Sequence, residues 1–290
     1  MNAILAYGRM IKFSHSIFAM PFALASAWLA SRQSPLSPGG WALVVVCMVS
    51  ARSAAMGFNR LVDRRFDAAN PRTSIREIPS GQISVGAARA FVALSAGVFV
   101  AAASWLHPLC GYLSPVALLV VCGYSYAKRF TSLVHLWLGA ALGLAPVATW
   151  IAVTGTVSTA ALVLAGAVDT WVAGFDILYS LQDEDFDRGQ GLRSVPAALG
   201  QTGALWVSGG LHLLTAALLA ALPSVVTLTW PYWVGVGVIT VVLAYEHWLV
   251  RPGDLSKIDK AFFDLNGYVS LVFLAGVLLG GAGRLKSRQA

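Results

Sequence analysis

Long apolar runs separated by short polar or turn-forming segments dominate the chain. Nine of these runs approach or reach the roughly 20 residues that an α-helix needs to cross the hydrocarbon of a bilayer. They cover residues 13–30, 41–58, 87–106, 112–126, 133–153, 160–181, 204–222, 232–250 and 267–283. The fourth run is short, and Pro146 interrupts the fifth. The pattern predicts an all-α, polytopic membrane protein that folds as a bundle of nine transmembrane helices.

The composition also indicates a membrane protein. Of the 290 residues, 57% are hydrophobic and only 11% are charged, whereas charged residues make up about 25% of a typical soluble domain. A soluble fold with so few polar side chains could not cover its own surface. No soluble domain fits between the runs, so residues 1–290 are expected to form a single membrane domain.

The positive charges predict how the chain lies in the membrane. A net charge of +7 is compatible with nucleic-acid binding, but uneven Lys and Arg usage in membrane proteins usually reflects topology. With nine spans, fifteen of the twenty Lys and Arg lie on the side of the N-terminus, four lie on the opposite side, and Arg52 lies within the second run. The N-terminus is therefore expected in the cytoplasm and the C-terminus across the cell (inner) membrane. The bilayer, and no nucleic acid, is the expected environment.

The acidic residues are concentrated in two windows. Eight of the thirteen Asp and Glu lie within residues 59–81 and 176–193. Both windows begin near the cytoplasmic end of an even-numbered run, so they face the same compartment. An acid at membrane depth costs roughly 2.5–3.5 kcal/mol on insertion scales, so a cluster of them indicates function.

The spacing of the acids suits shared metal ions. Asn59, Asp63 and Asp67 follow at intervals of four residues, which places them on one face of a helix. Asp183 and Asp187 repeat that interval. Mg²⁺ takes one or two protein carboxylates and completes its coordination with water and phosphate oxygens, and nearby arginines bind the same phosphate group. The windows therefore predict Mg²⁺ and a diphosphate at the rim of a lipid-accessible bundle, and a polyprenyl diphosphate is the expected ligand.

These segments resemble the UbiA superfamily of intramembrane aromatic prenyltransferases. The first acidic motif has the family pattern Asn-x3-Asp-x3-Asp, and the second, which starts at Asp176, has the pattern Asp-x6-Asp-x3-Asp. Residues 124–131 (YSYAKRFT) look like the family's Tyr-x-Lys-Arg-x-Thr loop, and residues 11–22 (IKFSHSIFAMPF) are similar to the start of its 4-hydroxybenzoate branch. The resemblance covers roughly residues 10–280 and implies the nine-helix UbiA-like architecture.

The resemblance implies Mg²⁺-dependent transfer of a polyprenyl group from polyprenyl diphosphate to an aromatic ring carbon. The diphosphate would leave an allylic carbon, and the aromatic acceptor would attack the resulting cation. The implied metal-binding residues are Asn59, Asp63, Asp67, Asp183 and Asp187. The implied diphosphate-binding residues are Arg72, Lys128, Arg129 and Arg193, the last at a position where some members have lysine. Asp176 and Tyr126 are the candidates for stabilising the cation or removing the ring proton.

Two further residues are candidates for binding the acceptor. Arg52 could bind the carboxylate of an aromatic acid, or it could neutralise Asp63 or a buried carbonyl group. His15 could bind the same carboxylate, or it could be an interfacial histidine with local partners. Two acceptors stay open: 4-hydroxybenzoate for ubiquinone, or a hydroxynaphthoate for menaquinone, as in a subgroup that resembles the 4-hydroxybenzoate enzymes.

The alternative class is a cation-coupled membrane transporter in which Asp63, Asp176 and Asp183 relay ions. The sequence shows no inverted repeat and no matching pair of broken helices, which are typical of such transporters. The acids also lie at one rim, whereas transporters bind their substrates near the midplane. The sequence therefore favours an enzyme.

Overall fold

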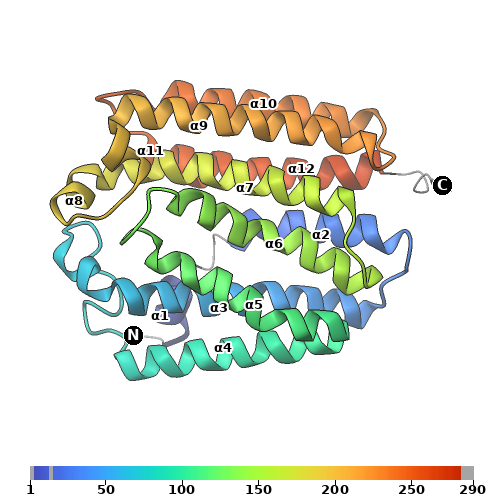
Figure 1. Ribbon diagram of the computed structural model, residues 1–290, viewed down its shortest axis with the longest axis horizontal. Helices are drawn as coiled ribbons and strands as arrows, with labels where there is room; N and C mark the ends of the chain where they lie inside the picture. Colours follow the sequence, from blue (N-terminus) through green and yellow to red (C-terminus); the bar gives the residue numbers. More distant parts are fainter. Residues whose placement is uncertain (1–2, 13–15, 282–290) are drawn as a thin grey trace.

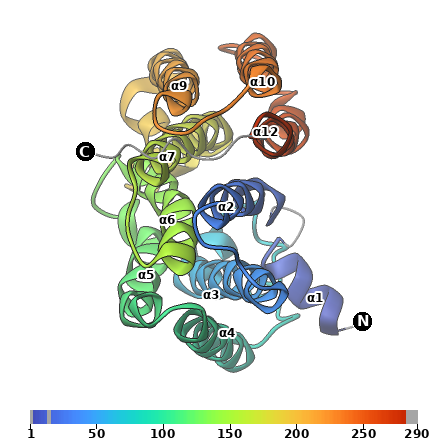
Figure 2. The same ribbon diagram turned by 90° about the vertical axis from the view of Figure 1, so that its right-hand side faces the viewer.

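The computed structural model describes residues 3–12 and 16–281. Within them, long helices run side by side along one axis (Figures 1 and 2). They are α2 (Ser16–Ser31), α3 (Pro38–Ala69), α4 (Val85–Leu106), α5 (Pro108–Ala127), α6 (Val134–Thr154), α7 (Thr159–Ser180), α9 (Val195–Ala221), α10 (Trp230–Leu249) and α12 (Asn266–Gly280). The short helices are α1 (Ala3–Met10), α8 (Glu184–Gly189) and α11 (Ile258–Lys260).

Within the described residues, each predicted apolar run overlaps one of the long helices. Eight of them, by length and composition, can cross a membrane, and the first is a shorter apolar helix, Phe18–Ser31. Large apolar side chains such as Leu119 and Leu213 are 72% and 73% exposed on the outside of the bundle, as expected for a surface that faces lipid. The predicted interruption at Pro146 is wrong: α6 continues through it, and the Pro146 carbonyl accepts a hydrogen bond from Ser26 Oγ on α2.

α7 lies in the middle of the bundle and carries much of its core. The end-on view places it between α6 and α9, and it packs closely against both (Figure 2). Its buried Trp171 packs against Phe22 of α2, and its buried Phe175 packs against Trp171 and against Phe18 of α2. Phe22 also stacks on Phe273 of α12, with ring centroids 4.4 Å apart. This aromatic layer fixes the position of α7, from whose end the second acidic window continues.

α6 and α7 approach closely because two glycines of α6 face the backbone of α7. A Cβ atom at Gly139 would overlap the carbonyl oxygen and the side chain of Asp169, and one at Gly143 would lie 2.8 Å from the carbonyl oxygen of Ala165. Small residues at this spacing are typical of tightly packed helices in membranes.

Replacing Gly139 by alanine is expected to destabilise the protein, because the added methyl group must push α6 away from α7. Overpacking of this kind costs roughly 1–3 kcal/mol. Gly97→Ala in α4 is the matched control, since a Cβ atom there meets no atom within 4 Å, and alanine in a helix is favoured over glycine by roughly 0.5–1 kcal/mol. Thermal unfolding in detergent should show a lower melting temperature for Gly139→Ala only; equal melting temperatures would contradict the close contact.

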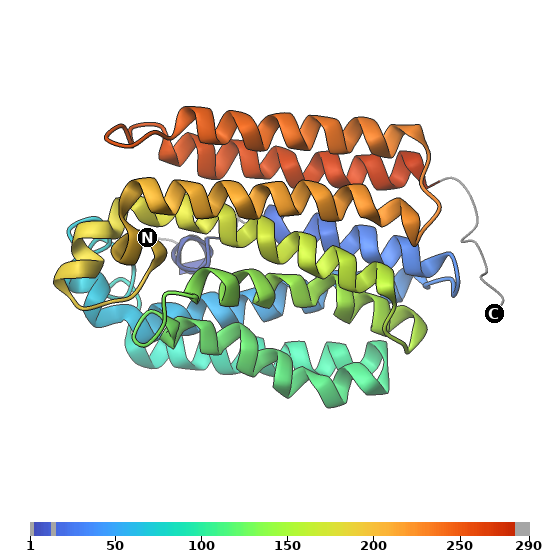
Figure 3. The ribbon, with the colours of Figure 1, turned by 45° about the horizontal axis from the view of Figure 1, so that its top comes forward.

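Both acidic windows lie at the same end of the bundle, as predicted. α3 extends to Ala69, and Asn70 caps it. α7 ends at Ser180 and continues through a 3₁₀ turn, Leu181–Asp183, into α8. Figure 3 shows α8 beside the end of α3 and the loop that follows it.

Candidate functional site

A cavity of about 260 Å³ lies between the two acidic windows. Its walls come from α3 and the loop after it, the ends of α5 and α7, the first turns of α6, and α8. The residues predicted to bind metal all line it: Asn59, Asp63, Asp67, Asp183 and Asp187. Asp176, Arg52, Arg72, Lys128 and Arg129 line it as well. The fold therefore brings together motifs that are more than 100 residues apart in the chain.

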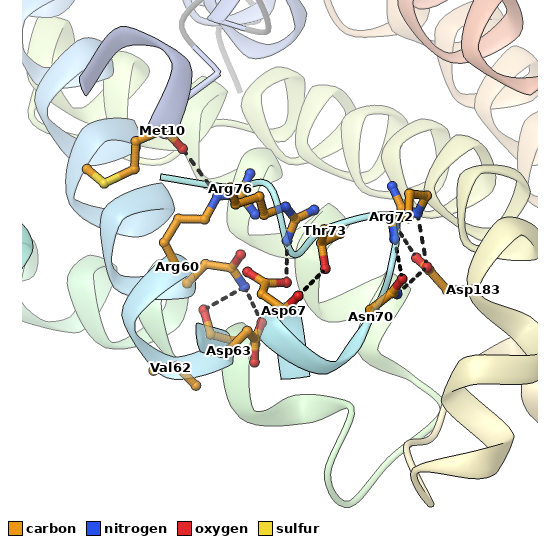
Figure 4. A network of polar contacts seen from close by, with 12 residues as sticks. Met10, Arg60, Val62, Asp63, Asp67, Asn70, Arg72, Thr73, Arg76 and Asp183 are labelled. Atoms are coloured by element: carbon orange, nitrogen blue, oxygen red, sulfur yellow. Dashed lines mark hydrogen bonds and ion pairs between the residues drawn. The ribbon is translucent and has the colours of Figure 1, made fainter. Parts of the chain in front are cut away.

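The first motif occupies one face of α3, as its spacing predicts. Asn59 Nδ2 donates a hydrogen bond to Asp63 Oδ2 at 2.8 Å. Arg129 Nη2 lies 3.0 Å from Asp63 Oδ1. Arg76 Nη1 lies 2.6 Å from Asp67 Oδ1 (Figure 4). The two carboxylates that point into the cavity from α3 thus each have a cationic partner.

The second motif is tied to the loop after α3. Arg72 forms a two-pronged contact with Asp183, with Nε 3.1 Å from Oδ1 and Nη2 2.5 Å from Oδ2. Asn70 Nδ2 donates a further hydrogen bond to Asp183 Oδ1 at 3.1 Å (Figure 4). Lys128 Nζ lies 3.0 Å from Asp187 Oδ2. Burial disfavours the Lys128 ammonium, but the carboxylates of Asp187, Asp183 and Asp176 together raise the pKa of Lys128.

The carboxylates of the two motifs are therefore compensated by cations within the protein. Four aspartates of the two motifs are each paired with an Arg or Lys that also lines the cavity. A metal ion that binds the aspartates would release these cations, and an anion that binds the cations would release the aspartates. The arrangement favours ligands that bring both charges together.

The donor set suits a hard divalent cation. Asp67 Oδ2 is buried and has no hydrogen-bond partner among the described residues. In the part of the chain that the structure describes, no three His, Cys, Asp or Glu side chains lie close enough to hold an ion alone. Mg²⁺ commonly uses only one or two protein carboxylates and takes its other oxygens from water and phosphate. Carboxylates on both sides of the cavity therefore fit Mg²⁺ that binds together with a diphosphate.

Lys12 is a cavity residue that the sequence did not single out. It follows α1 with a left-handed backbone (φ 47°), a conformation that is uncommon for residues other than glycine. Its Nζ lies 5.5 Å and 5.6 Å from the ring centroids of Tyr179 and Phe263. Arg60 Nε holds the end of α1 by donating to the Met10 carbonyl (Figure 4). Lys12 thus lines the same cavity as the two motifs.

Lys12 titrates near neutral pH. Burial lowers the pKa of its ammonium group to about 7, and the positive charges of Arg60, Arg76, Arg72 and Arg52 act in the same direction. A lysine surrounded by arginines in a partly buried cavity indicates a site for a multiply charged anion.

The structure places two predicted residues outside the cavity. Tyr126 is 46% exposed, and its ring contacts Phe58 and the Arg129 guanidinium. Tyr124 lines the cavity instead, because residues two positions apart point to opposite sides of a helix. The prediction that Tyr126 acts on the reacting atoms is therefore corrected.

Arg193 is the second predicted site residue that lies outside the cavity. It is exposed, donates through Nη1 to the Phe130 carbonyl at 2.8 Å, and its backbone N–H donates to the Lys128 carbonyl. It therefore braces the segment that carries Lys128, and the prediction that it grips diphosphate is corrected. Arg76, which pairs with Asp67, provides the additional cation at the cavity.

A second cavity of about 310 Å³ adjoins the first and is lined mainly by apolar side chains of α2 to α6. The residues that line both cavities are Arg52, Met56, Tyr124, Leu138 and Leu142. Arg52 Nη2 donates to the Lys12 carbonyl at 3.5 Å, while its buried Nε has no hydrogen-bond partner among the described residues. Asp63 pairs with Arg129 and not with Arg52. His15, the other acceptor-binding candidate, lies outside the described residues.

The chain is similar over nearly its whole length to known proteins. The UbiA prenyltransferase family matches residues 19–279. A 4-hydroxybenzoate octaprenyltransferase from Edwardsiella ictaluri is 30% identical over 95% of this chain and 96% of its own length. One from Tolumonas auensis is 31% identical over 88% of both chains.

Solved structures show the same fold. A UbiA homologue from Aeropyrum pernix superimposes with a TM-score of 0.83 at 33% identity, covering 91% of this chain and 97% of that chain. A UbiA homologue from Archaeoglobus fulgidus, bound to GPP and Mg²⁺, has a TM-score of 0.71 at 19% identity, over 94% of this chain and 98% of that chain. Sequence and fold together show that this membrane protein belongs to the UbiA prenyltransferase family.

Proposed function

We propose that the protein transfers a polyprenyl group from polyprenyl diphosphate to a ring carbon of an aromatic acid, with Mg²⁺, in ubiquinone or menaquinone biosynthesis. The observation that carries the proposal is a cavity in which two acidic motifs meet a cluster of cations and which continues into an apolar cavity. The relatives named 4-hydroxybenzoate octaprenyltransferase support the same reaction.

The polar cavity is suited to the diphosphate. Arg72, Arg76, Lys128 and Arg129 would donate hydrogen bonds to its oxygens, since guanidinium groups bind phosphate in a two-pronged geometry. Asp63, Asp67, Asp183 and Asp187, with Asn59, would hold Mg²⁺. When bound, Mg²⁺ neutralises the charge that develops on a departing diphosphate. The adjoining apolar cavity would hold the isoprenoid tail, or the part of it nearest the head group.

Arg52 is the proposed partner of the acceptor carboxylate. Its guanidinium lies where the polar and apolar cavities meet, and its Nε has a free donor within the described structure. A buried charged group without a counter-ion is costly, so a ligand carboxylate would stabilise it. An aromatic acid held in this way would place its ring between the diphosphate site and the tail.

Asp176 is the proposed catalytic residue. When the allylic C–O bond breaks, the bonding electron pair leaves with the diphosphate. The ring carbon of the acceptor then forms a bond to the allylic cation. The ring C–H bond finally gives its proton to the Asp176 carboxylate. A fixed negative charge beside the reacting atoms would also stabilise the cation, because charge stabilisation in a preorganised site is a large catalytic effect.

The Lys and Arg distribution supports a cytoplasmic position for this end of the bundle and for the N-terminus. The charged diphosphate head group would then reach the cavity from the cytoplasm, while the isoprenoid tail stays in the membrane.

A transfer assay tests the proposed function. Purified protein in detergent is given radiolabelled polyprenyl diphosphate, Mg²⁺ and either 4-hydroxybenzoate or a hydroxynaphthoate, separately and in competition. We expect a prenylated aromatic product that disappears with EDTA, and the preferred acid identifies the pathway. If folded protein forms no product with either acid but binds polyprenyl diphosphate in an EDTA-sensitive way, the assigned acceptors are wrong. Loss of that binding as well would contradict the prenyltransferase assignment.

The affinity for polyprenyl diphosphate is expected to fall as the pH rises from 7 to 9. The pKa of Lys12 is about 7 in the free protein, so its ammonium loses its proton over this range. A bound diphosphate stabilises the ammonium, so binding above pH 7 takes up a proton and weakens by at most about tenfold per pH unit. Lys12→Arg should flatten this dependence, because a guanidinium stays charged throughout. Equilibrium binding of labelled polyprenyl diphosphate at saturating Mg²⁺ measures this pH dependence. If the affinity of Lys12→Arg falls with pH as steeply as that of the wild type, the proton taken up on binding does not belong to Lys12.

A further inference from the structure

A buried histidine holds the proposed catalytic carboxylate. His135, in the first turn of α6, is 1% exposed, and its Nδ1 lies 2.7 Å from Asp176 Oδ2. The Asp176 side chain is 22% exposed and lines the polar cavity. The histidine is thus behind the carboxylate, on the side away from the cavity, and is not itself a cavity residue.

The second ring nitrogen of His135 determines its protonation state. The backbone N–H of Val195, the first residue of α9, donates to His135 Nε2 at 3.3 Å. Nε2 therefore carries a lone pair, and the single ring proton lies on Nδ1, where it is donated to Asp176. Protonating Nε2 would remove the acceptor that Val195 needs. The pair is consequently a neutral imidazole and a carboxylate, and its negative charge faces the cavity.

The contact at Val195 connects this pair to the segment that binds the head group. Arg193, two residues before Val195, donates its backbone N–H to the Lys128 carbonyl and its guanidinium to the Phe130 carbonyl. Lys128 in turn pairs with Asp187. The orientation of Asp176 is therefore linked to the start of α9 and to the segment after α5 through one histidine.

We propose that His135 is a positioning residue that fixes the Asp176 carboxylate toward the reacting atoms and keeps it an acceptor of protons. The proposal rests on the proposed function, since Asp176 must act in prenyl transfer. The Nδ1–H donor restrains rotation of the carboxylate, and a displacement of about 1 Å in a catalytic group can cost 10²-fold in rate. His135 itself does not exchange protons with the substrate.

Two variants separate the two hydrogen bonds of His135. Asparagine places an N–H₂ donor near the position of Nδ1 but does not reach Val195, so His135→Asn keeps the bond to Asp176. Glutamine extends to the position of Nε2 and can accept from Val195, so His135→Gln keeps that contact and loses the Nδ1 donor. A role in positioning Asp176 predicts a kcat about 10–100-fold lower for His135→Gln and a kcat near that of the wild type for His135→Asn. The affinity for polyprenyl diphosphate with Mg²⁺ should be unchanged in both.

A purely structural role predicts the reverse. If His135 serves only to accept the hydrogen bond from the Val195 backbone N–H at the start of α9, His135→Asn would have the lower melting temperature and activity, and His135→Gln would resemble the wild type. That result would overturn the proposal. Combining His135→Gln with Asp176→Ala adds a second test, because a residue that acts through Asp176 should not lower kcat further once that carboxylate is gone. A further multiplicative loss in the double variant would contradict the proposal.

The ring tautomer can be measured without any enzymatic assay. In protein labelled with ¹⁵N-histidine, the His135 signals, assigned by their loss in His135→Gln, should show a protonated Nδ1 and an unprotonated Nε2. A protonated Nε2 would overturn the assignment of the hydrogen bonds. If the tautomer is as expected but the wild type transfers no prenyl group, the proposed function fails while the geometry of the His135–Asp176 pair stands.

Discussion

Replacing Asp183 by asparagine is expected to lower the rate of prenyl transfer by about 10²–10³-fold, the range found when one preorganised hydrogen-bond donor to a transition state is removed. Asp183 lies between Arg72 and Asn70 and faces the first motif across the cavity. Asparagine retains the size of the side chain but loses the negative charge that Mg²⁺ requires. The measurement is the initial rate at saturating concentrations of both substrates and Mg²⁺.

Asp185 provides the matched control. It lies two residues further along, in α8, is exposed, and does not line the cavity. Asp185→Asn makes the same chemical change two residues away from Asp183 and should retain the wild-type rate. Asp63→Asn, in the first motif, should lose as much activity as Asp183→Asn. Full activity in either motif variant would contradict a site built from both motifs.

Replacing Arg52 by methionine is expected to raise the KM for the aromatic acid by about 10²-fold or more, since breaking a buried ion pair costs about 3–5 kcal/mol. Methionine fills a similar volume without the charge. The affinity for polyprenyl diphosphate should not change, because the guanidinium is proposed to bind the acceptor. Steady-state kinetics with varied acceptor, together with diphosphate binding, measure the two effects.

An acceptor without a carboxylate isolates the contact. A plain phenol should be a poor substrate for the wild type and no worse for Arg52→Met. Arg32→Met is the control for the loss of one arginine, since Arg32 stacks on Trp28 and does not line either cavity. A fall in diphosphate affinity with an unchanged acceptor KM would move Arg52 to the head-group site.

The helices and the meeting of the two motifs were predictable from the sequence. Apolar runs of this length have few alternatives to membrane-spanning helices, because backbone groups in lipid must be hydrogen-bonded within the segment. Counting spans then places both acidic windows at the same end. The interval of four residues between Asn59, Asp63 and Asp67 predicted one helical face, and the hydrogen bond from Asn59 to Asp63 fits that arrangement.

The choice among neighbouring polar residues was not predictable. Tyr124 and Tyr126 are both polar aromatic residues at the end of one helix, and only the rotation of α5 in the bundle decides which enters the cavity. The guanidinium of Arg193 donates to a backbone carbonyl group, and every residue type has such a group, so the sequence could not indicate this contact. Lys12 reaches the site because α1 folds back against α3, a tertiary contact that its local sequence does not specify.

The pairing of each aspartate with a cation was also invisible in the sequence. Arg72 and Asp183 are 111 residues apart, and Arg129 and Asp63 are 66 apart. Such pairs need the whole bundle to form before the side chains meet. They explain how several charges are kept at the rim of an apolar protein, because each is compensated by a neighbour.

The most direct test of the site is the mutual dependence of Mg²⁺ and diphosphate binding. A ligand that binds alone must break the ion pairs of the cavity and leave either the aspartates or the arginines and lysine without a counter-ion. When both ligands bind, Mg²⁺ would bind the aspartates and the diphosphate would bind the arginines and the lysine. Calorimetric titration of a non-reactive polyprenyl thiodiphosphate, with and without Mg²⁺, measures the coupling. We expect Mg²⁺ to tighten binding at least about tenfold, and the analogue to tighten Mg²⁺ binding by the same factor, as linkage requires. Equal affinities with and without the metal would show that the two acidic motifs do not form one metal–diphosphate site.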